Sequence, residues 1–122
     1  MIVAQVLSAT LLVTVAIGPA LDTGHAVNFS TEQKAAATEP LVRSATECIV
    51  HSVVTDPRYG TEAGTVGDLI VGSMRSCLTP VRAMIDAYDR YYGEGTGEAF
   101  FMGPYLDVLP KAVMAGAKDA AQ

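Results

Sequence analysis

The chain contains no tryptophan, only two histidines and only two cysteines. A zinc site of the Cys and His type needs three or four ligands that converge on one point, and too few remain if the two cysteines bond to each other. The sequence also lacks Cys-x-x-Cys and Cys-x-x-Cys-His, which argues against a thioredoxin-like redox site and a c-type haem. We therefore expect neither a metal nor a cofactor.

Basic residues are few as well. Eight Lys and Arg stand against thirteen Asp and Glu, so that the net charge is −5 at pH 7. The cations are scattered along the chain and form no cluster that would attract the phosphates of nucleic acid or anionic lipid headgroups. The composition therefore predicts that the protein does not bind nucleic acid.

The first 33 residues have no Lys or Arg, and Ile2 to Leu21 is an uncharged, mostly apolar run. A Gly-Pro pair interrupts this run near its end, and Gly24 and Ala26 place small residues where a signal peptidase would require them. We expect residues 1–26 to be a signal peptide. The remaining chain would then be exported to the periplasm or the extracellular space.

Residues 27–122 are enough for one domain, and we expect them to form a single helical domain. The location of that domain depends on whether the N-terminal run is cleaved. About 20 apolar residues are also long enough to cross a bilayer, so an uncleaved run could anchor the domain to a membrane. The alternative is therefore a membrane-anchored accessory protein with an uncleaved leader. Contact with a membrane is expected only in that case.

Cys48 and Cys77 are the only cysteines, so only one disulfide is possible. An even number of cysteines in an exported chain is typical of disulfide bonding. Closing a loop of about 30 residues stabilises a protein by roughly 3–4 kcal/mol in the chain-entropy model. We expect the bond to join the apolar faces of two helices, one at 40–55 and one at 66–78.

Helix signals occur along most of residues 27–122. Ser30 followed by Gln33 matches the capping box that begins many helices. Apolar residues then recur at intervals of three and four, and no alternation typical of a strand is long enough to predict a sheet. The fold class predicted is all-α: a small bundle of four to five short helices with one inter-helix disulfide, preceded by the apolar N-terminal helix of the signal peptide.

Prolines and glycines suggest where these helices begin and end. Pro40 is expected to begin a new helix, and Thr79 with Pro80 to cap another at 80–92, because proline suits the first turn of a helix. Four glycines between Gly93 and Gly103 predict a non-helical loop with positive φ angles or a close backbone approach. A last helix follows, with Pro110 disturbing its first turns and a tail that frays from Ala115.

Aromatic side chains are concentrated around this glycine-rich segment. Six of the eight in the chain lie within it or beside it: Tyr88, Tyr91, Tyr92, Phe100, Phe101 and Tyr105. Three interpretations are open. They form a core cluster in which Phe100 and Phe101 close the end of the bundle, a contact surface for another protein, or the wall of a pocket for a small apolar ligand.

No arrangement of residues identifies a catalytic site. His51 would be the only histidine of the mature chain, and no Gly-x-Ser-x-Gly or similar signature accompanies it. Glu94 and Glu98 lie on the predicted loop, where no rigid element would fix the spacing that a pair of catalytic carboxylates needs. We therefore expect a small exported non-catalytic protein that binds another exported protein through the aromatic segment; the alternative is a binder of a small apolar ligand.

Overall fold

The computed structural model describes residues 28–120, and every regular element in this part of the chain is helical, which confirms the all-α class. The predicted signal peptide lies outside the described residues. No helix among 28–120 has both the length and the apolar character needed to cross a membrane. The elements are α1 (Thr31–Val54), α2 (Val66–Ser73), α3 (Leu78–Tyr92), α4 (Thr96–Phe100), the π-helical η2 (Phe101–Tyr105) and α5 (Leu106–Ala120).

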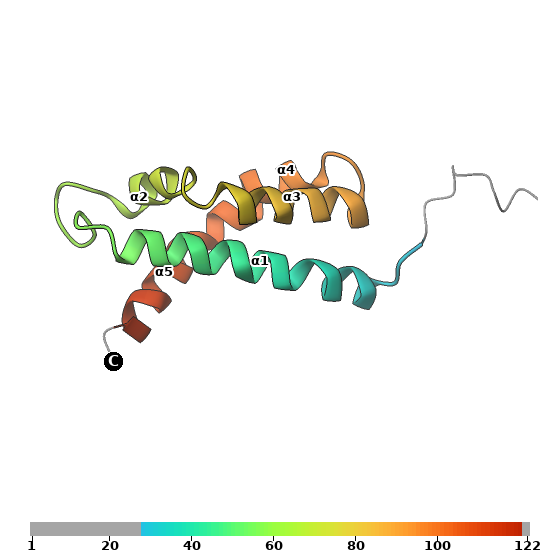
Figure 1. The fold of residues 1–122 in the computed structure, drawn as a ribbon, viewed down its shortest axis with the longest axis horizontal. Helices are drawn as coiled ribbons and strands as arrows, with labels where there is room; N and C mark the ends of the chain where they lie inside the picture. Colours follow the sequence, from blue (N-terminus) through green and yellow to red (C-terminus); the bar gives the residue numbers. More distant parts are fainter. Residues whose placement is uncertain (1–27, 121–122) are drawn as a thin grey trace, which may run out of the picture.

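The long helix α1 lies along the molecule, and α2, α3 and α5 all pack against it (Figure 1). It begins at the predicted capping box. The backbone N–H of Gln33 donates to the Ser30 hydroxyl at 3.2 Å, and the backbone N–H of Ser30 donates to the Gln33 side chain at 2.8 Å. Two N–H groups that the first helical turn leaves without a carbonyl partner are thereby satisfied.

The prediction that Pro40 begins a new helix is wrong, because α1 continues through it. Proline inside a helix leaves the carbonyl four residues earlier, that of Ala36, without its donor. Both Pro40 and Ala36 are exposed, so water can bond this carbonyl. Thr38, before Pro40 in the sequence, and Ala45, after it, are both buried on the opposite face of α1. Because residues before and after the proline are packed, one continuous helix is favoured over two.

The boundary between the next two helices also differs from the prediction. Helix α2 ends at Ser73 rather than near 78, and α3 begins at Leu78 with Cys77 as its N-cap. Pro80 therefore occupies the third position of α3 instead of the first, and Thr79 does not cap the helix. The missing N–H of Pro80 still costs nothing, because none of the first helical N–H groups has a partner within the helix.

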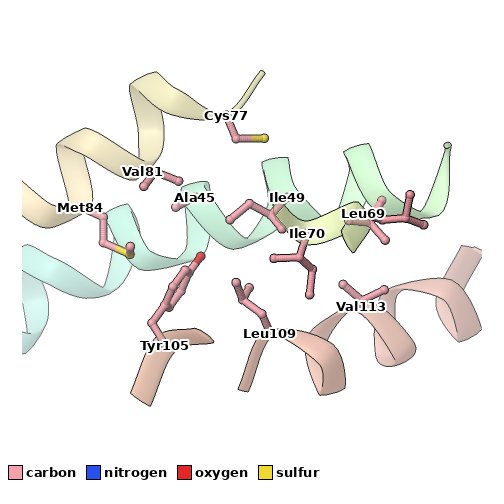
Figure 2. Packing of buried hydrophobic residues seen from close by; sticks show 11 residues of the cluster. Ala45, Ile49, Leu69, Ile70, Cys77, Val81, Met84, Tyr105, Leu109 and Val113 are labelled. Carbon is pink, nitrogen blue, oxygen red and sulfur yellow. The ribbon is translucent and has the colours of Figure 1, made fainter. Parts of the chain in front are cut away.

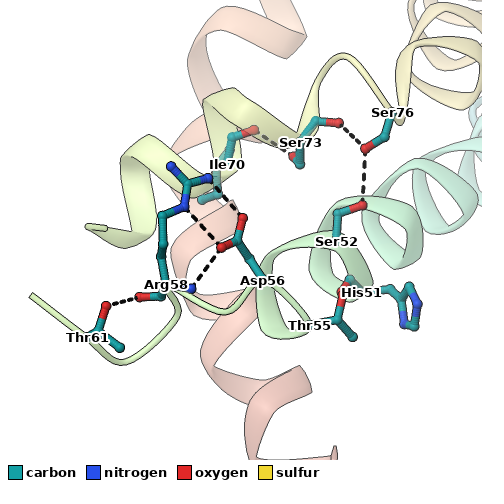
Figure 3. Close-up of polar contacts among 9 residues, drawn as sticks. All are labelled: His51, Ser52, Thr55, Asp56, Arg58, Thr61, Ile70, Ser73 and Ser76. Carbon is teal, nitrogen blue, oxygen red and sulfur yellow. Dashed lines mark hydrogen bonds and ion pairs between the residues drawn. The ribbon is translucent and has the colours of Figure 1, made fainter. Parts of the chain in front are cut away.

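A loop from Thr55 to Thr65 joins α1 to α2. The Arg58 side chain folds back onto Asp56, with its Nη2 atom 2.9 Å from Oδ2 (Figure 3). These hydrogen bonds, aided by the backbone N–H of Arg58, hold the pKa of Asp56 at about 2, below its ordinary value of 3.8. The Thr65 hydroxyl then caps α2 by accepting from the backbone N–H of Asp68.

Most of the glycine-rich segment is helical, which corrects the prediction of a loop over 93–103. Only the turn before α4 is irregular, and there Gly93 and Gly95 have φ angles of 118° and 86°, a region that favours glycine. Gly97 supplies the expected close approach, since a Cβ atom there would collide with the backbone carbonyl of Ile85. Glycine at 97 thus lets α4 lie directly against α3.

The last helix is also more regular than predicted. Helix α5 includes Pro110 without ending, and it continues to Ala120 instead of fraying from Ala115. Gly116 explains part of this, because a Cβ atom at that position would collide with the Val50 side chain of α1. The end of α5 is therefore held against α1.

The hydrophobic core lies where α1, α2, α3, η2 and α5 meet (Figure 2). Ile49, Met84, Leu109 and Val113 are completely or almost completely buried in it. Among the described residues, no buried side-chain nitrogen or oxygen lacks a hydrogen-bond partner. The core members are Ala45, Ile49, Val53, Leu69, Ile70, Cys77, Val81, Met84, Tyr105, Leu109 and Val113.

Cys48 and Cys77 form the predicted disulfide, with Cα atoms 5.8 Å apart. This separation lies within the range that a disulfide requires. One detail of the prediction is wrong, because Cys77 lies in the turn between α2 and α3 and not within the helix at 66–78. The bond therefore fastens α1 to the beginning of α3, and it closes the loop that contains α2.

We predict that replacing Cys48 or Cys77 with serine lowers the free energy of unfolding by about 2–5 kcal/mol, because the unfolded chain gains the freedom that the bond removes. Chemical denaturation of the oxidised protein, the reduced protein and both variants measures the loss. The reduced wild-type protein should resemble the variants. Equal stability of the oxidised and reduced forms would contradict the prediction.

Gly97→Ala should lower the free energy of unfolding by about 1–3 kcal/mol, because the new methyl group overlaps the backbone of Ile85 and forces α4 away from α3. Gly103→Ala is the matched control, since no atom lies within 4 Å of a Cβ placed at Gly103. The control should be neutral or slightly stabilising. Thermal unfolding of both variants distinguishes crowding at 97 from a general effect of adding alanine.

Candidate functional site

Four of the six candidate aromatics form a continuous series of ring contacts. The rings of Tyr88 and Phe100 are almost parallel, with centroids 4.1 Å apart and planes 8° apart. Phe100 also contacts Tyr105 at 5.5 Å, and Tyr88 stacks on Tyr92 at 5.0 Å. Helices α3, α4 and η2 thus bring together side chains that are up to 17 positions apart in the sequence.

Tyr105 is the buried end of this series, with 2% of its surface exposed. Its hydroxyl lies 2.9 Å from the Thr46 hydroxyl of α1. Thr46 gives its own proton to the Val42 carbonyl at 2.6 Å, so Tyr105 is the donor to Thr46. Burial raises the pKa of Tyr105. Tyr105 belongs to the core rather than to a surface.

The other candidates are less buried. Phe101 is half-buried and contacts Tyr105 at 5.9 Å, so Phe100 and Phe101 pack against the core without being enclosed by it. Tyr92 is 40% exposed, and its ring lies 5.3 Å from the Lys34 ammonium of α1. Tyr91 points to a different neighbour, Phe29, at 5.0 Å. The six aromatics therefore divide between core and surface.

A hollow of about 360 Å³ opens beside the Tyr88–Phe100 stack, between α1 on one side and α3 and α4 on the other. We call it the aromatic groove. Its lining is mainly apolar, and its charged side chains come from one helix. The lining residues are Thr38, Glu39, Val42, Arg43, Thr46 and Glu47 of α1, Tyr88 of α3 and Phe100 of α4.

Sequence reasoning identified one wall of this groove and missed the other. The sequence makes Tyr88 and Phe100 candidates for a contact or pocket, but it did not lead us to predict that α1 lies opposite them. One signal was present: Thr38, Val42 and Thr46 recur every four residues, next to the stripe of α1 that enters the core. Such a half-apolar stripe is typical of a helix edge that is only partly covered.

The groove has few groups with chemical reactivity. Its ionisable members on α1 are Glu39, Arg43 and Glu47, which are all exposed. His51 is exposed on α1 and is not part of the lining. Glu94 and Glu98 are exposed beyond the C-terminal end of α3, and they do not line the groove either. Within residues 28–120, no three His, Cys, Asp or Glu side chains are placed to hold a metal ion. The arrangement suits binding by shape and apolar contact.

Comparison with known proteins gives no further guide: no family model, no curated protein and no solved structure matches the chain. A function can therefore be proposed only from the chemistry of its own residues. The aromatic groove is the basis for this, because it combines half-buried aromatic rings with an open apolar hollow.

We predict that Tyr105→Phe lowers the free energy of unfolding by about 1 kcal/mol, since it removes one hydrogen bond while Thr46 keeps its bond to Val42. The same variant also tests how the free energy of unfolding depends on pH. Burial raises the pKa of both Tyr88 and Tyr105 in the folded protein. The free energy of unfolding is therefore unaffected by these two groups below about pH 10, and it falls as the pH rises past this value. Denaturation at several alkaline pH values should show a smaller fall for Tyr105→Phe than for wild type; an equal fall would contradict the assignment.

Proposed function

We propose that this chain is a small exported, non-catalytic protein that binds another exported protein, and that the aromatic groove is the contact site. The disulfide is compatible with an oxidising, exported location. The signal-peptide pattern of residues 1–26 supports the same location. If the leader is retained, the same groove serves a membrane-anchored accessory protein.

The observation that carries this proposal is the position of the Tyr88–Phe100 stack. Both rings are half-buried, and both line an open hollow instead of closing it. Protein interfaces commonly place aromatic anchors at an apolar centre and surround them with polar residues. Here Val42 and the two rings supply the centre, and the charged side chains of α1 supply the edge.

The occupant that fits this groove is an apolar side chain presented by the partner. Two carboxylates, Glu39 and Glu47, border the groove with one cation, Arg43. The chain as a whole carries a net charge of −5. We therefore expect the partner to place basic residues around its apolar anchor, so that added salt slows association.

The second candidate is a small apolar ligand. The volume favours it, because about 360 Å³ lies within the range of about 300–1,000 Å³ that is usual for small-molecule sites. The shape favours a protein side chain, since small-molecule sites bury most of the ligand surface and this groove opens to solvent. A side chain that remains attached to its own protein needs no such enclosure.

Photo-crosslinking tests the proposal directly. A photoreactive phenylalanine derivative replaces Val42 in the groove, and in a matched control it replaces Val71, which is 72% exposed on α2 and does not line the groove. In the native host we expect one predominant protein adduct from position 42 and none from position 71. Val42→Asp should fold normally, as judged by circular dichroism, and should lose the same partner.

Two results would contradict the proposal. The same adducts from positions 42 and 71 would show that the groove does not select its partner. A small molecule retained at one per chain in the intact mass of the purified native protein, and lost in Val42→Asp, would favour the ligand-binding alternative instead.

A further inference from the structure

A second groove lies on the other flank of α1, and it shares no residue with the aromatic groove. Its volume is about 480 Å³, and α1 and α3 form its two sides. Three of its lining residues are alanines, so that another helix can approach closely. The lining consists of Ala37 and Leu41 of α1 with Ala83, Asp86, Ala87, Arg90 and Tyr91 of α3. We call it the alanine groove.

The charges along α3 indicate what occupies the alanine groove. Arg82, Asp86 and Arg90 follow one another at intervals of four residues, and Glu94 continues the series just after the helix. The signs therefore alternate as plus, minus, plus, minus. A series of this kind is complementary to itself when it is read in the opposite direction, because every cation then meets an anion.

These charges are available for such a contact. All four side chains are exposed, and within residues 28–120 the structure contains one ion pair, which joins Arg58 to Asp56. Arg82, Asp86 and Arg90 thus do not form the pairs along α3 that their spacing allows. Asp86 and Arg90 also line the alanine groove, so the charges lie beside its small apolar surface.

We propose that a second copy of this chain docks in the alanine groove, with the two α3 helices antiparallel across a two-fold axis. Asp86 of each copy then faces Arg90 of the other, and Arg82 faces Glu94. A two-fold contact uses the same patch on both copies, which is the arrangement that a self-complementary series favours. Because this groove lies apart from the aromatic groove, the proposal does not depend on the proposed function.

Charge reversal gives a test that the series itself defines. Asp86→Arg leaves two arginines facing each other across the axis, and Arg90→Asp leaves two aspartates. Each variant alone should be a monomer, or should dimerise at least about tenfold more weakly than wild type. An equimolar mixture of the two variants should form a heterodimer, because every facing pair is again of opposite sign.

Sedimentation velocity of the disulfide-intact protein at several concentrations measures these states, and circular dichroism confirms that each variant is folded. Matched controls reverse exposed charges outside the groove, with Arg75→Asp on the turn after α2 and Asp119→Arg near the end of α5. Both should dimerise like wild type. Salt should weaken the wild-type dimer.

Three outcomes would overturn the proposal. Wild-type protein that remains a monomer up to millimolar concentration has no such contact. A dimer that both reversals leave unchanged is formed by another surface. Single variants that are monomeric and stay so when mixed show that the charges act within one copy, or toward a different partner, and not across a two-fold axis.

Discussion

Helix α1 passes Pro40 without a break, and α2, α3 and α5 pack against it. A proline inside a helix costs about 3 kcal/mol or more in isolation, so packing has to compensate for it. Buried side chains on both sides of Pro40 supply that compensation, with Thr38 before it and Ala45 after it. The disulfide then ties the C-terminal half of α1 to the start of α3 and limits how far these two helices can separate.

The two halves of α1 have different neighbours: α3 lies along its N-terminal half, and α2 and α5 lie near its C-terminal half (Figure 1). Its C-terminal half enters the core through Ile49 and Val53, where α2 and α5 also meet. Its N-terminal half lies against α3 and remains open on each flank, with the aromatic groove on one side and the alanine groove on the other. Two separate grooves thus flank the pair formed by α1 and α3, and α4 adds Phe100 to one of them.

Local sequence patterns predicted the features that depend on neighbouring residues. The capping box at Ser30 and the all-α class follow from such patterns, and the disulfide follows because two cysteines allow one pairing. The same patterns failed at Pro40 and at Gly97, where packing against α3 outweighs the local preference. They also missed the α1 wall of the aromatic groove, because Val42 and Tyr88 meet only when the chain is folded.

Amide hydrogen exchange across α1 tests most directly whether this helix is continuous. If it is, the backbone amides of α1 are protected on both sides of Pro40, from Thr38 through Ile49, and they open together with the core. Protection that begins only after Pro40, with fast exchange from Lys34 to Glu39, would contradict the account. In that case the N-terminal half of α1 would not be a fixed wall, and neither groove would exist as described.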